Sequence, residues 1–84
     1  MRYSVELKPR AIKDLRRIPQ EDASRIADAL EILADGLRGN VKRLAQFMPE
    51  YRLRVGDYRV LFEIEDRTRI VVYRVRHRRE AYRT

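Results

Sequence analysis

Apolar and polar residues alternate through the second half of the chain, which is the pattern of strands with one buried face. Residues 51–60, YRLRVGDYRV, place arginine at alternate positions on both sides of Gly56-Asp57. This pattern predicts a hairpin with strands over 50–55 and 58–65. Gly56 favours a type II′ turn, because the first turn position requires a positive φ. The same alternation predicts two further strands, over 69–76 and 2–7.

Apolar residues recur with helical spacing in the first half of the chain. A first helix is predicted near Pro9, a residue suited to the first helical turn. Its apolar stripe consists of Ala11, Leu15 and Ile18. A second helix follows Pro19 and ends near Gly36, a plausible left-handed terminator. Its stripe consists of Ile26, Leu30, Leu33 and Leu37. The connector 37–50 holds one short extended piece around 41–44.

These elements predict an α+β domain with the order β-α-α-β-β-β. We expect a mostly antiparallel sheet, two helices packed on one of its faces, and a short C-terminal turn or helix. The 84 residues form a single domain, 1–84, with one modest core. The predicted core residues are Ile26, Leu30, Leu33, Val60, Phe62 and Tyr73.

The parity of residues along the strands assigns them to the two faces of the sheet. One face is apolar or aromatic throughout the hairpin: Tyr51, Leu53, Val55, Tyr58, Val60, Phe62 and Ile64. An even number of residues in the loop near Asp66 adds Val71, Tyr73 and Val75. An odd number would turn Arg74 and Arg76 into the core, where unpaired charges are costly. We therefore expect an even loop and an opposite face that carries Arg52, Arg54, Arg59, Arg74 and Arg76.

The excess of positive charge indicates which kind of partner the protein binds. The chain has 20 Lys+Arg against 13 Asp+Glu, a net charge of +7, and 17 of the 20 cations are arginine. Arginine binds phosphate with a planar fork and stacks on bases, so the composition favours nucleic acid or another polyanion. The sequence contains no cysteine, no membrane-length apolar run and no secretory signal pattern. We therefore expect a cytoplasmic protein with no membrane contact.

Arg54 and Arg59 oppose each other across the predicted hairpin. Like charges in this relation destabilise a sheet, and the nearest acids, Glu63 and Glu65, lie at the far end of their strand. The arginines form either a plain solvated surface or an anion site whose ligand relieves the repulsion. The cationic centre favours the anion site. A phosphodiester is the best match to several arginine forks.

The C-terminal residues 77–84, HRREAYRT, extend the basic surface. They add the positive charges of Arg78, Arg79 and Arg83. Tyr82 provides a ring suited to unpaired bases, or alternatively one that holds the terminal turn against the sheet. An unperturbed histidine side chain has a pKa near neutral pH, at about 6.5, so His77 is a candidate proton carrier, although a lone histidine at a strand end is more often structural. We expect no metal and no cofactor, because no ligand constellation, phosphate loop or nucleophilic triad is evident.

The chain resembles the RelE/ParE superfamily of toxins from prokaryotic toxin–antitoxin pairs. The resemblance is strongest in YRLRVGDYRVLFEIED and VYRVRHRREAYR and covers essentially the whole chain. Its most specific parts are GDYRV and HRR-x-x-YR, and the basic pattern is closer to RelE than to ParE. RelE proteins are ribosome-dependent endonucleases that cut mRNA in the ribosomal A site. Their chemistry is metal-free, and the ribose 2′-hydroxyl attacks the adjacent phosphate.

The resemblance implies roles for matching residues. Arg59 matches the arginine that holds the scissile phosphate, Arg78 the one that stabilises or protonates the leaving group, and Tyr82 the tyrosine at the nucleotide. Arg52 and Arg54 stand where family members often have lysine. As arginines they suit electrostatic clamps rather than general bases. The base is left open among Tyr82, an acidic residue, a ribosomal group and no well-defined group. The implied RNA-binding surface adds Arg74, Arg76, Arg79 and Arg83.

The resemblance also implies partners: an acidic RelB-like antitoxin, the ribosome and mRNA, with promoter DNA bound only through the antitoxin complex. The alignment of Arg78 and Arg79 is open by one residue. Two alternatives have other functions. One is a ParE-like toxin that binds DNA gyrase, and the other is a non-catalytic nucleic-acid-binding module. Arg59, Arg78 and Tyr82 together argue against the ParE-like alternative.

Overall fold

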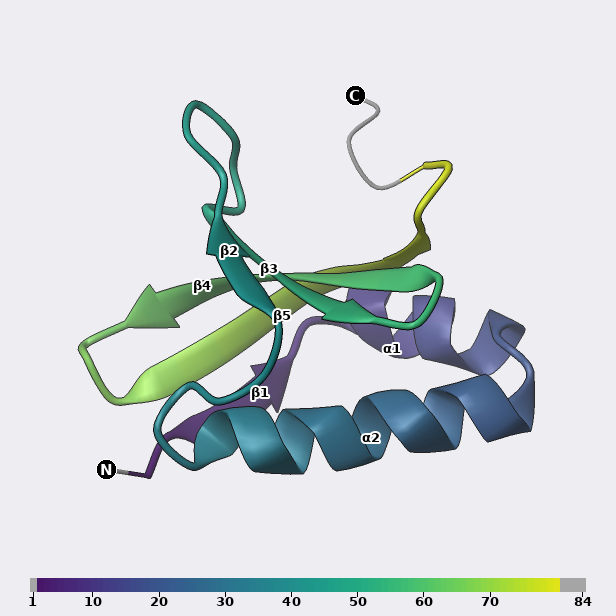
Figure 1. The fold of residues 1–84 in the computed structure, drawn as a ribbon, viewed down its shortest axis with the longest axis horizontal. Helices are drawn as coiled ribbons and strands as arrows, with labels where there is room; N and C mark the ends of the chain where they lie inside the picture. The colour runs from purple at the N-terminus through teal and green to yellow at the C-terminus, as the bar shows by residue number, and fades with distance from the viewer. Residues whose placement is uncertain (1, 81–84) are drawn as a thin grey trace.

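The computed structural model describes residues 2–80 and contains two helices and a mixed five-stranded sheet. The elements are β1 (Ser4–Leu7), α1 (Pro9–Arg17), α2 (Gln20–Ala34), β2 (Val41–Arg43), β3 (Tyr51–Val55), β4 (Tyr58–Glu65) and β5 (Arg69–His77). The strand order is β1-β5-β4-β3-β2, and β1 runs parallel to β5. Both helices cover one side of the sheet, whereas the β2–β3 loop and the yellow segment directly after β5 rise on the other side (Figure 1). The predicted α+β class is confirmed, with β2 as an additional strand.

Both predicted helices begin at prolines. Pro9 lies in the first turn of α1, where a missing N–H removes no helical hydrogen bond, and Pro19 is the N-cap of α2. Gly36 follows α2 with a φ of 78°, the left-handed conformation predicted for a terminator. The N–H of Leu37 donates to the carbonyl of Leu33 at 2.9 Å and closes the last turn. Neither helix is long and apolar enough to cross a bilayer.

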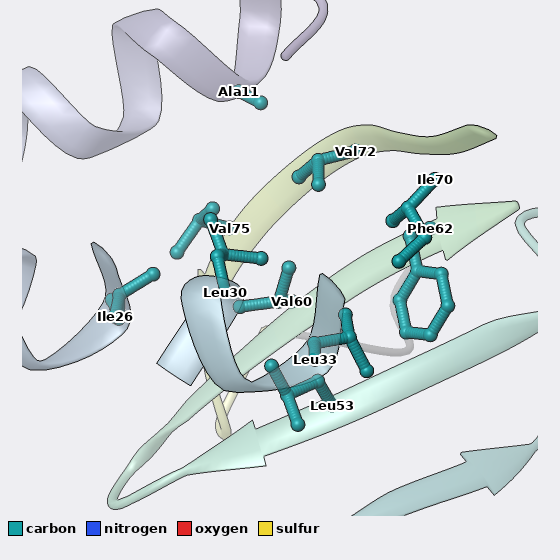
Figure 2. Close-up of a cluster of buried hydrophobic side chains, with 10 residues drawn as sticks. All are labelled: Ala11, Ile26, Leu30, Leu33, Leu53, Val60, Phe62, Ile70, Val72 and Val75. Atoms are coloured by element: carbon teal, nitrogen blue, oxygen red, sulfur yellow. The ribbon is translucent and has the colours of Figure 1, made fainter. Parts of the chain in front are cut away.

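An apolar core lies between the helices and the sheet (Figure 2). Its buried members are Ala11, Ile26, Leu30, Leu33, Leu53, Val60, Phe62, Ile70, Val72 and Val75. The helical spacing of α2 and the alternation of the strands bring these side chains onto facing surfaces. The predicted core is confirmed for Ile26, Leu30, Leu33, Val60 and Phe62.

The hairpin has the predicted register. Val55 pairs with Tyr58, and Arg54 pairs with Arg59. Gly56 has a φ of 57°, and a Cβ added to it would meet no atom within 4 Å. Backbone conformation rather than lack of space therefore requires glycine at this turn. The extended piece predicted around 41–44 is β2, which pairs antiparallel with β3.

The prediction of an even loop between the last two long strands is wrong. Glu65 pairs with Arg69, so the loop 66–68 has three residues. A β-bulge then restores the parity that the odd loop disturbs. Phe62 pairs with Val72 whereas Leu61 pairs with Arg74, and the residue between, 73, is the extra one in β5.

The odd loop and the bulge together correct two of the predicted face assignments. Ile70 and Val72 enter the core before the bulge, and Val75 enters it afterwards. Tyr73 was predicted in the core but is only partly buried, and its hydroxyl donates to Glu65 at 3.1 Å. Val71 was also predicted on the core face, but it pairs with Glu63 on the opposite face of the sheet.

The edge of β5 is completed by α1. The register of β1 with β5 ends at the pair Leu7 and Val72, so the later residues of β5 have no strand beside them on that edge. The carboxylate of Asp14 accepts a hydrogen bond from the N–H of Val75 at 2.9 Å. It also accepts from Nε and Nη2 of Arg74 at 2.8 and 3.1 Å. One carboxylate therefore replaces a missing strand partner and binds an arginine.

The same contacts set the pKa of Asp14. Burial by itself would raise that pKa, but the hydrogen bonds from Arg74 and Val75 and the charges of Arg74 and Arg76 outweigh burial and lower it. A lowered native pKa means that the carboxylate stabilises the fold above its unfolded pKa of about 3.9. This contribution is lost as pH falls below that value through the native pKa.

We expect Asp14→Asn to lower the free energy of unfolding at pH 7 by about 1–2 kcal/mol, because a charged hydrogen-bonded group is lost at a partly buried position. The difference from the unsubstituted protein should shrink below about pH 4, where the native carboxylate also becomes protonated. Urea denaturation at pH 7 and pH 3 measures both values. Asp28→Asn, at an exposed position of α2, is the matched control and should change little. Equal losses for the two variants would contradict the role given to Asp14.

Candidate nucleic-acid interface

Cationic side chains form two rows across the sheet face that the helices leave uncovered. In the first row, Arg54 on β3, Arg59 on β4 and Arg76 on β5 are paired across neighbouring strands. The second row consists of Lys42, Arg52, Leu61 and Arg74. Strands lie about 4.8 Å apart, so the backbone positions of the first row span only about 10 Å. Arg52, Arg54, Arg59 and Arg76 together form the arginine cluster.

No carboxylate within the described residues forms an ion pair with the arginine cluster. Nη1 of Arg52 donates to the carbonyl and the side-chain oxygen of Asn40 at 3.2 and 3.3 Å. The Nε atoms of Arg52 and Arg76 are buried and have no acceptor in the described part of the chain. The positive charge of the arginine cluster is therefore not compensated by a carboxylate of the described residues, as an anion site requires.

Arg59 and Arg78 both contact the Gly56-Asp57 turn. Nη1 of Arg59 donates to the carbonyls of Gly56 and Tyr58 at 3.2 and 3.1 Å. The N–H of Arg78 donates to the carbonyl of Asp57 at 2.7 Å. The guanidinium of Arg78 also lies 4.0 Å from the Asp57 carboxylate. The two arginines to which the sequence resemblance assigned the scissile phosphate and the leaving group therefore adjoin one turn.

Arg74 differs from the other predicted RNA-binding residues. Its guanidinium is held by Asp14 through two hydrogen bonds, and only 29% of its side chain is exposed. The hydrogen bond to Asp14 raises the pKa of Arg74. Arg74 therefore ties β5 to α1, whereas Arg76 belongs to the arginine cluster and Arg79 is exposed at the C-terminal turn.

His77 lies on the other side of the sheet from the arginine cluster. It pairs with Tyr58, which shares the helix-facing side with the core residue Val60. The His77 and Tyr58 rings meet edge to face, with centroids 5.5 Å apart. Nδ1 of His77 accepts a hydrogen bond from the N–H of Arg79 at 3.3 Å. This placement favours the structural role of His77 over that of proton carrier.

Two predicted site residues, Tyr82 and Arg83, lie outside the described residues. The C-terminal turn that precedes them is present, with the N–H of Glu80 donating to the carbonyl of His77 at 2.8 Å. Residues 2–80 include no group of three or more His, Cys, Asp or Glu that could hold a metal ion. The arrangement that the described residues do provide is a set of positive charges on the uncovered sheet face.

The sequence prediction missed one cation of this face. Lys42 joins the second row because β2 pairs with β3 and sets Lys42 opposite Arg52. The sequence did predict a short extended piece around 41–44, which contains Lys42. Nothing in the sequence showed which strand this piece would pair with. Edge strands as short as this one carry too little alternation to fix a register.

These features define a class: a small basic α+β protein with a cationic cluster on the sheet face that the helices leave uncovered. The family model for ParE toxins of type II toxin–antitoxin systems matches residues 5–82. The chain is 31% identical over 84 residues to the putative toxin RelE1 of Methanocaldococcus jannaschii, with 95% of this chain and 93% of the relative covered. The chain therefore belongs to the RelE/ParE family of toxins from type II toxin–antitoxin systems.

Solved structures agree with this assignment. The toxin–antitoxin complex RelBE2 from Mycobacterium tuberculosis contains a chain with a TM-score of 0.78 and 27% identity, covering 92% of this chain and 99% of that one. The RelB–RelE complex from Methanococcus jannaschii contains one with a TM-score of 0.75 and 28% identity, covering 92% and 94%. The protein is thus the toxin of a RelBE-type system.

Proposed function

We propose that this toxin inhibits translation by cleaving mRNA in the ribosomal A site, through metal-free attack of a ribose 2′-hydroxyl. The observation that carries the proposal is the arginine cluster, which lacks carboxylate partners among the described residues and shares the Gly56-Asp57 turn with Arg78. The likeness to relatives named RelE supports the same conclusion.

The reaction needs fixed charge more than a proton carrier. The 2′-oxygen bonds to phosphorus while the bond to the 5′-oxygen breaks, which leaves a 2′,3′-cyclic phosphate and a 5′-hydroxyl. Charge develops on the phosphoryl oxygens and on the leaving oxygen, so cations already in place favour the transition state over the ground state. Arg59 is assigned to the scissile phosphate and Arg78 to the leaving oxygen. Arg52 and Arg54 act as clamps, because an arginine side chain stays protonated at physiological pH and is a poor general base.

The residues around this centre take supporting roles. Arg76, Arg79 and Arg83 are assigned to the phosphates on either side of the cleaved bond. Arg74 acts through Asp14, because its fork is already bound there. Tyr82 is the candidate for nucleotide contact and for removal of the 2′-proton.

The proposed protein partner is an acidic RelB-like antitoxin. The similar chains from Mycobacterium tuberculosis and Methanococcus jannaschii are in complexes with antitoxins. An acidic segment that folds over the arginine cluster would supply the missing negative charge and block RNA from the same face.

The proposal is tested by incubating the purified toxin with ribosomes programmed with a defined mRNA and mapping the new 5′ ends. We expect ends within the A-site codon, with 5′-hydroxyl groups, and little cleavage of the same mRNA without ribosomes. The double variant Arg54→Glu/Arg59→Glu should lose the activity. Its matched control is Lys13→Glu/Arg16→Glu, which makes the same charge change on α1. Intact mRNA on the ribosome, or equal loss in both double variants, would count against the proposal.

The match to the ParE family model favours one alternative, a toxin that binds DNA gyrase. A supercoiling assay distinguishes the two functions. Inhibition of gyrase by the same preparation that leaves ribosome-bound mRNA intact would decide for the alternative.

A further inference from the structure

Asp14 lies where the helical pattern favours an apolar side chain. The residues of α1 that pack against the core are Ala11, Leu15 and Ile18. Asp14 comes three residues after Ala11 and four before Ile18, so it shares their side of the helix. Only 14% of its side chain is exposed. A carboxylate at such a position is costly unless it is hydrogen-bonded, and the described donors to Asp14 are all on β5.

The part of β5 that Asp14 contacts is the part after the bulge. The register of β1 with β5 ends at Val72, whose carbonyl accepts from the N–H of Lys8 at 2.9 Å, directly before α1 begins. The extra residue of the bulge comes next. Oδ2 of Asp14 then accepts from the N–H of Val75 at 2.9 Å and from Nε of Arg74 at 2.8 Å. On this edge the carboxylate thus holds the strand after the bulge.

Arg76 of the arginine cluster follows directly after this contact. It pairs with Arg59, so the two side chains start from neighbouring strands about 4.8 Å apart. Two backbone carbonyls hold Arg59, whereas the buried Nε of Arg76 has no acceptor in residues 2–80. The course of β5 therefore sets where the charge of Arg76 lies. Because a bulge bends and twists its strand, the segment after it needs a restraint on its free edge.

Asp14 is close to Arg76 but does not bind its guanidinium. Both residues line one pocket of about 270 Å³ at this edge of the sheet. Within the described residues, the Asp14 oxygens bind Arg74 and Val75 and form no ion pair with Arg76. A direct ion pair would withdraw Arg76 from a phosphate, as it does Arg74. Asp14 can therefore act on Arg76 through the backbone and leave its charge available.

We propose that Asp14 is a positioning residue of the cleavage site, which holds β5 after the bulge through the N–H of Val75 and thereby keeps Arg76 beside Arg59. This role rests on the proposed function, because it places positive charge for the transition state of cleavage. Asp14 itself touches neither the RNA nor the reacting atoms. Its loss leaves every cation of the cluster present, so RNA still binds, but a displaced charge stabilises the transition state less.

General support of the fold through the ion pair with Arg74 is the other role to consider. Two substitutions separate the contacts of Asp14. In Asp14→Asn the amide oxygen takes the place of Oδ2 and accepts from Val75, whereas the negative charge is lost. In Asp14→Ala both the acceptor and the charge are lost. Asparagine therefore keeps the restraint on β5 at a cost in stability, and alanine keeps neither.

The test measures single-turnover cleavage on programmed ribosomes and, separately, binding of a 2′-O-methyl oligonucleotide, whose attacking hydroxyl is blocked. We expect Asp14→Ala to cleave about tenfold more slowly than the unsubstituted toxin and to bind the oligonucleotide normally. Asp14→Asn should cleave nearly normally, although it is less stable. The matched control Asp28→Ala removes an exposed acid of α2 and should change neither value. Equal losses of cleavage in Asp14→Asn and Asp14→Ala, or a parallel loss of binding, would overturn the role.

A double-mutant cycle tests whether Asp14 acts through Arg76. Once Arg76→Ala has removed the guanidinium, its position no longer matters, so adding Asp14→Ala should slow cleavage little further. A general loss of structure would instead slow the Arg76→Ala variant by the same factor as the unsubstituted toxin, and that additivity would overturn the proposal. Asp14→Leu, which fills the site without an acceptor, replaces Asp14→Ala if the alanine variant does not fold.

Hydrogen exchange tests the restraint without any cleavage. The amide of Val75 should exchange faster in Asp14→Ala than in Asp14→Asn, and equal exchange in the two variants would contradict the restraint. If this difference is present but no form of the toxin cuts ribosome-bound mRNA, the proposed function fails and the hold of Asp14 on β5 stands. Cleavage by Asp14→Ala at the unsubstituted rate would overturn the positioning role alone.

Discussion

Arg59→Ala should lower the rate of mRNA cleavage on programmed ribosomes by 10-fold or more, about 1.4 kcal/mol of lost transition-state stabilisation. Arg59 has the central place in the first cationic row, between Arg54 and Arg76. Its guanidinium is held near the hairpin turn by two backbone carbonyls, so its charge is already in position before RNA arrives. Single-turnover cleavage with toxin in excess measures the chemical step.

Two control variants distinguish a specific role of Arg59 from a general effect of removing a charge or a side chain of the sheet. Arg16→Ala removes the same charge from an exposed position on α1, in the helix layer, and should change the rate little. His77→Gln should also be mild, because His77 lies on the helix-facing side of the sheet. A severe loss with His77→Gln and a mild loss with Arg59→Ala would mean that Arg59 is a scaffold residue and that the site lies elsewhere.

Phe62→Ala should lower the free energy of unfolding by about 3–5 kcal/mol. Phe62 is fully buried among residues from both layers, and its ring stacks on Tyr51 with centroids 5.5 Å apart. Domains of this size have a total stability of about 4–13 kcal/mol, so the variant loses a large fraction of it. Urea denaturation followed by circular dichroism measures the change.

Two further variants allow the loss of stability at Phe62 to be measured and compared. Phe62→Leu retains most of the apolar volume and should lose less stability, which keeps the protein folded if the alanine variant is not. Phe47→Ala, in the β2–β3 loop where the side chain is 44% exposed, should lose about 1 kcal/mol or less. Equal losses at positions 47 and 62 would contradict the core described here.

Much of the candidate site could be predicted from the sequence because it is built on a tight hairpin. The Gly56-Asp57 turn fixes the register of β3 and β4, so alternation alone set Arg52, Arg54 and Arg59 on one face. The pairing of Arg54 with Arg59 followed from the number of turn residues. The roles assigned to Arg78 and Tyr82 came from family resemblance, since local pattern gives no position for a chain end.

The residues that sequence reasoning misplaced depend on contacts between distant segments. Residues 66–68 form a three-residue loop, and only the bulge at Tyr73 returns Arg76 to the outer face. Strict alternation after an even loop therefore predicted the wrong face for Val71. It also predicted Tyr73 in the core, because a bulge depends on how two strands pack and cannot be read from alternation. The pairing of Lys42 with Arg52 likewise needed the register between β2 and β3.

The sequence by itself therefore determined the helices, the hairpin and the charge of its outer face, because each depends on spacing within a few residues of the chain. The tertiary structure decided which cations remain available to a ligand. Asp14 on α1 binds Arg74 across 60 positions of sequence, whereas no described carboxylate pairs with Arg54, Arg59 or Arg76. Local spacing cannot show that difference, since it depends on α1 lying along the edge of β5 that β1 leaves unpaired.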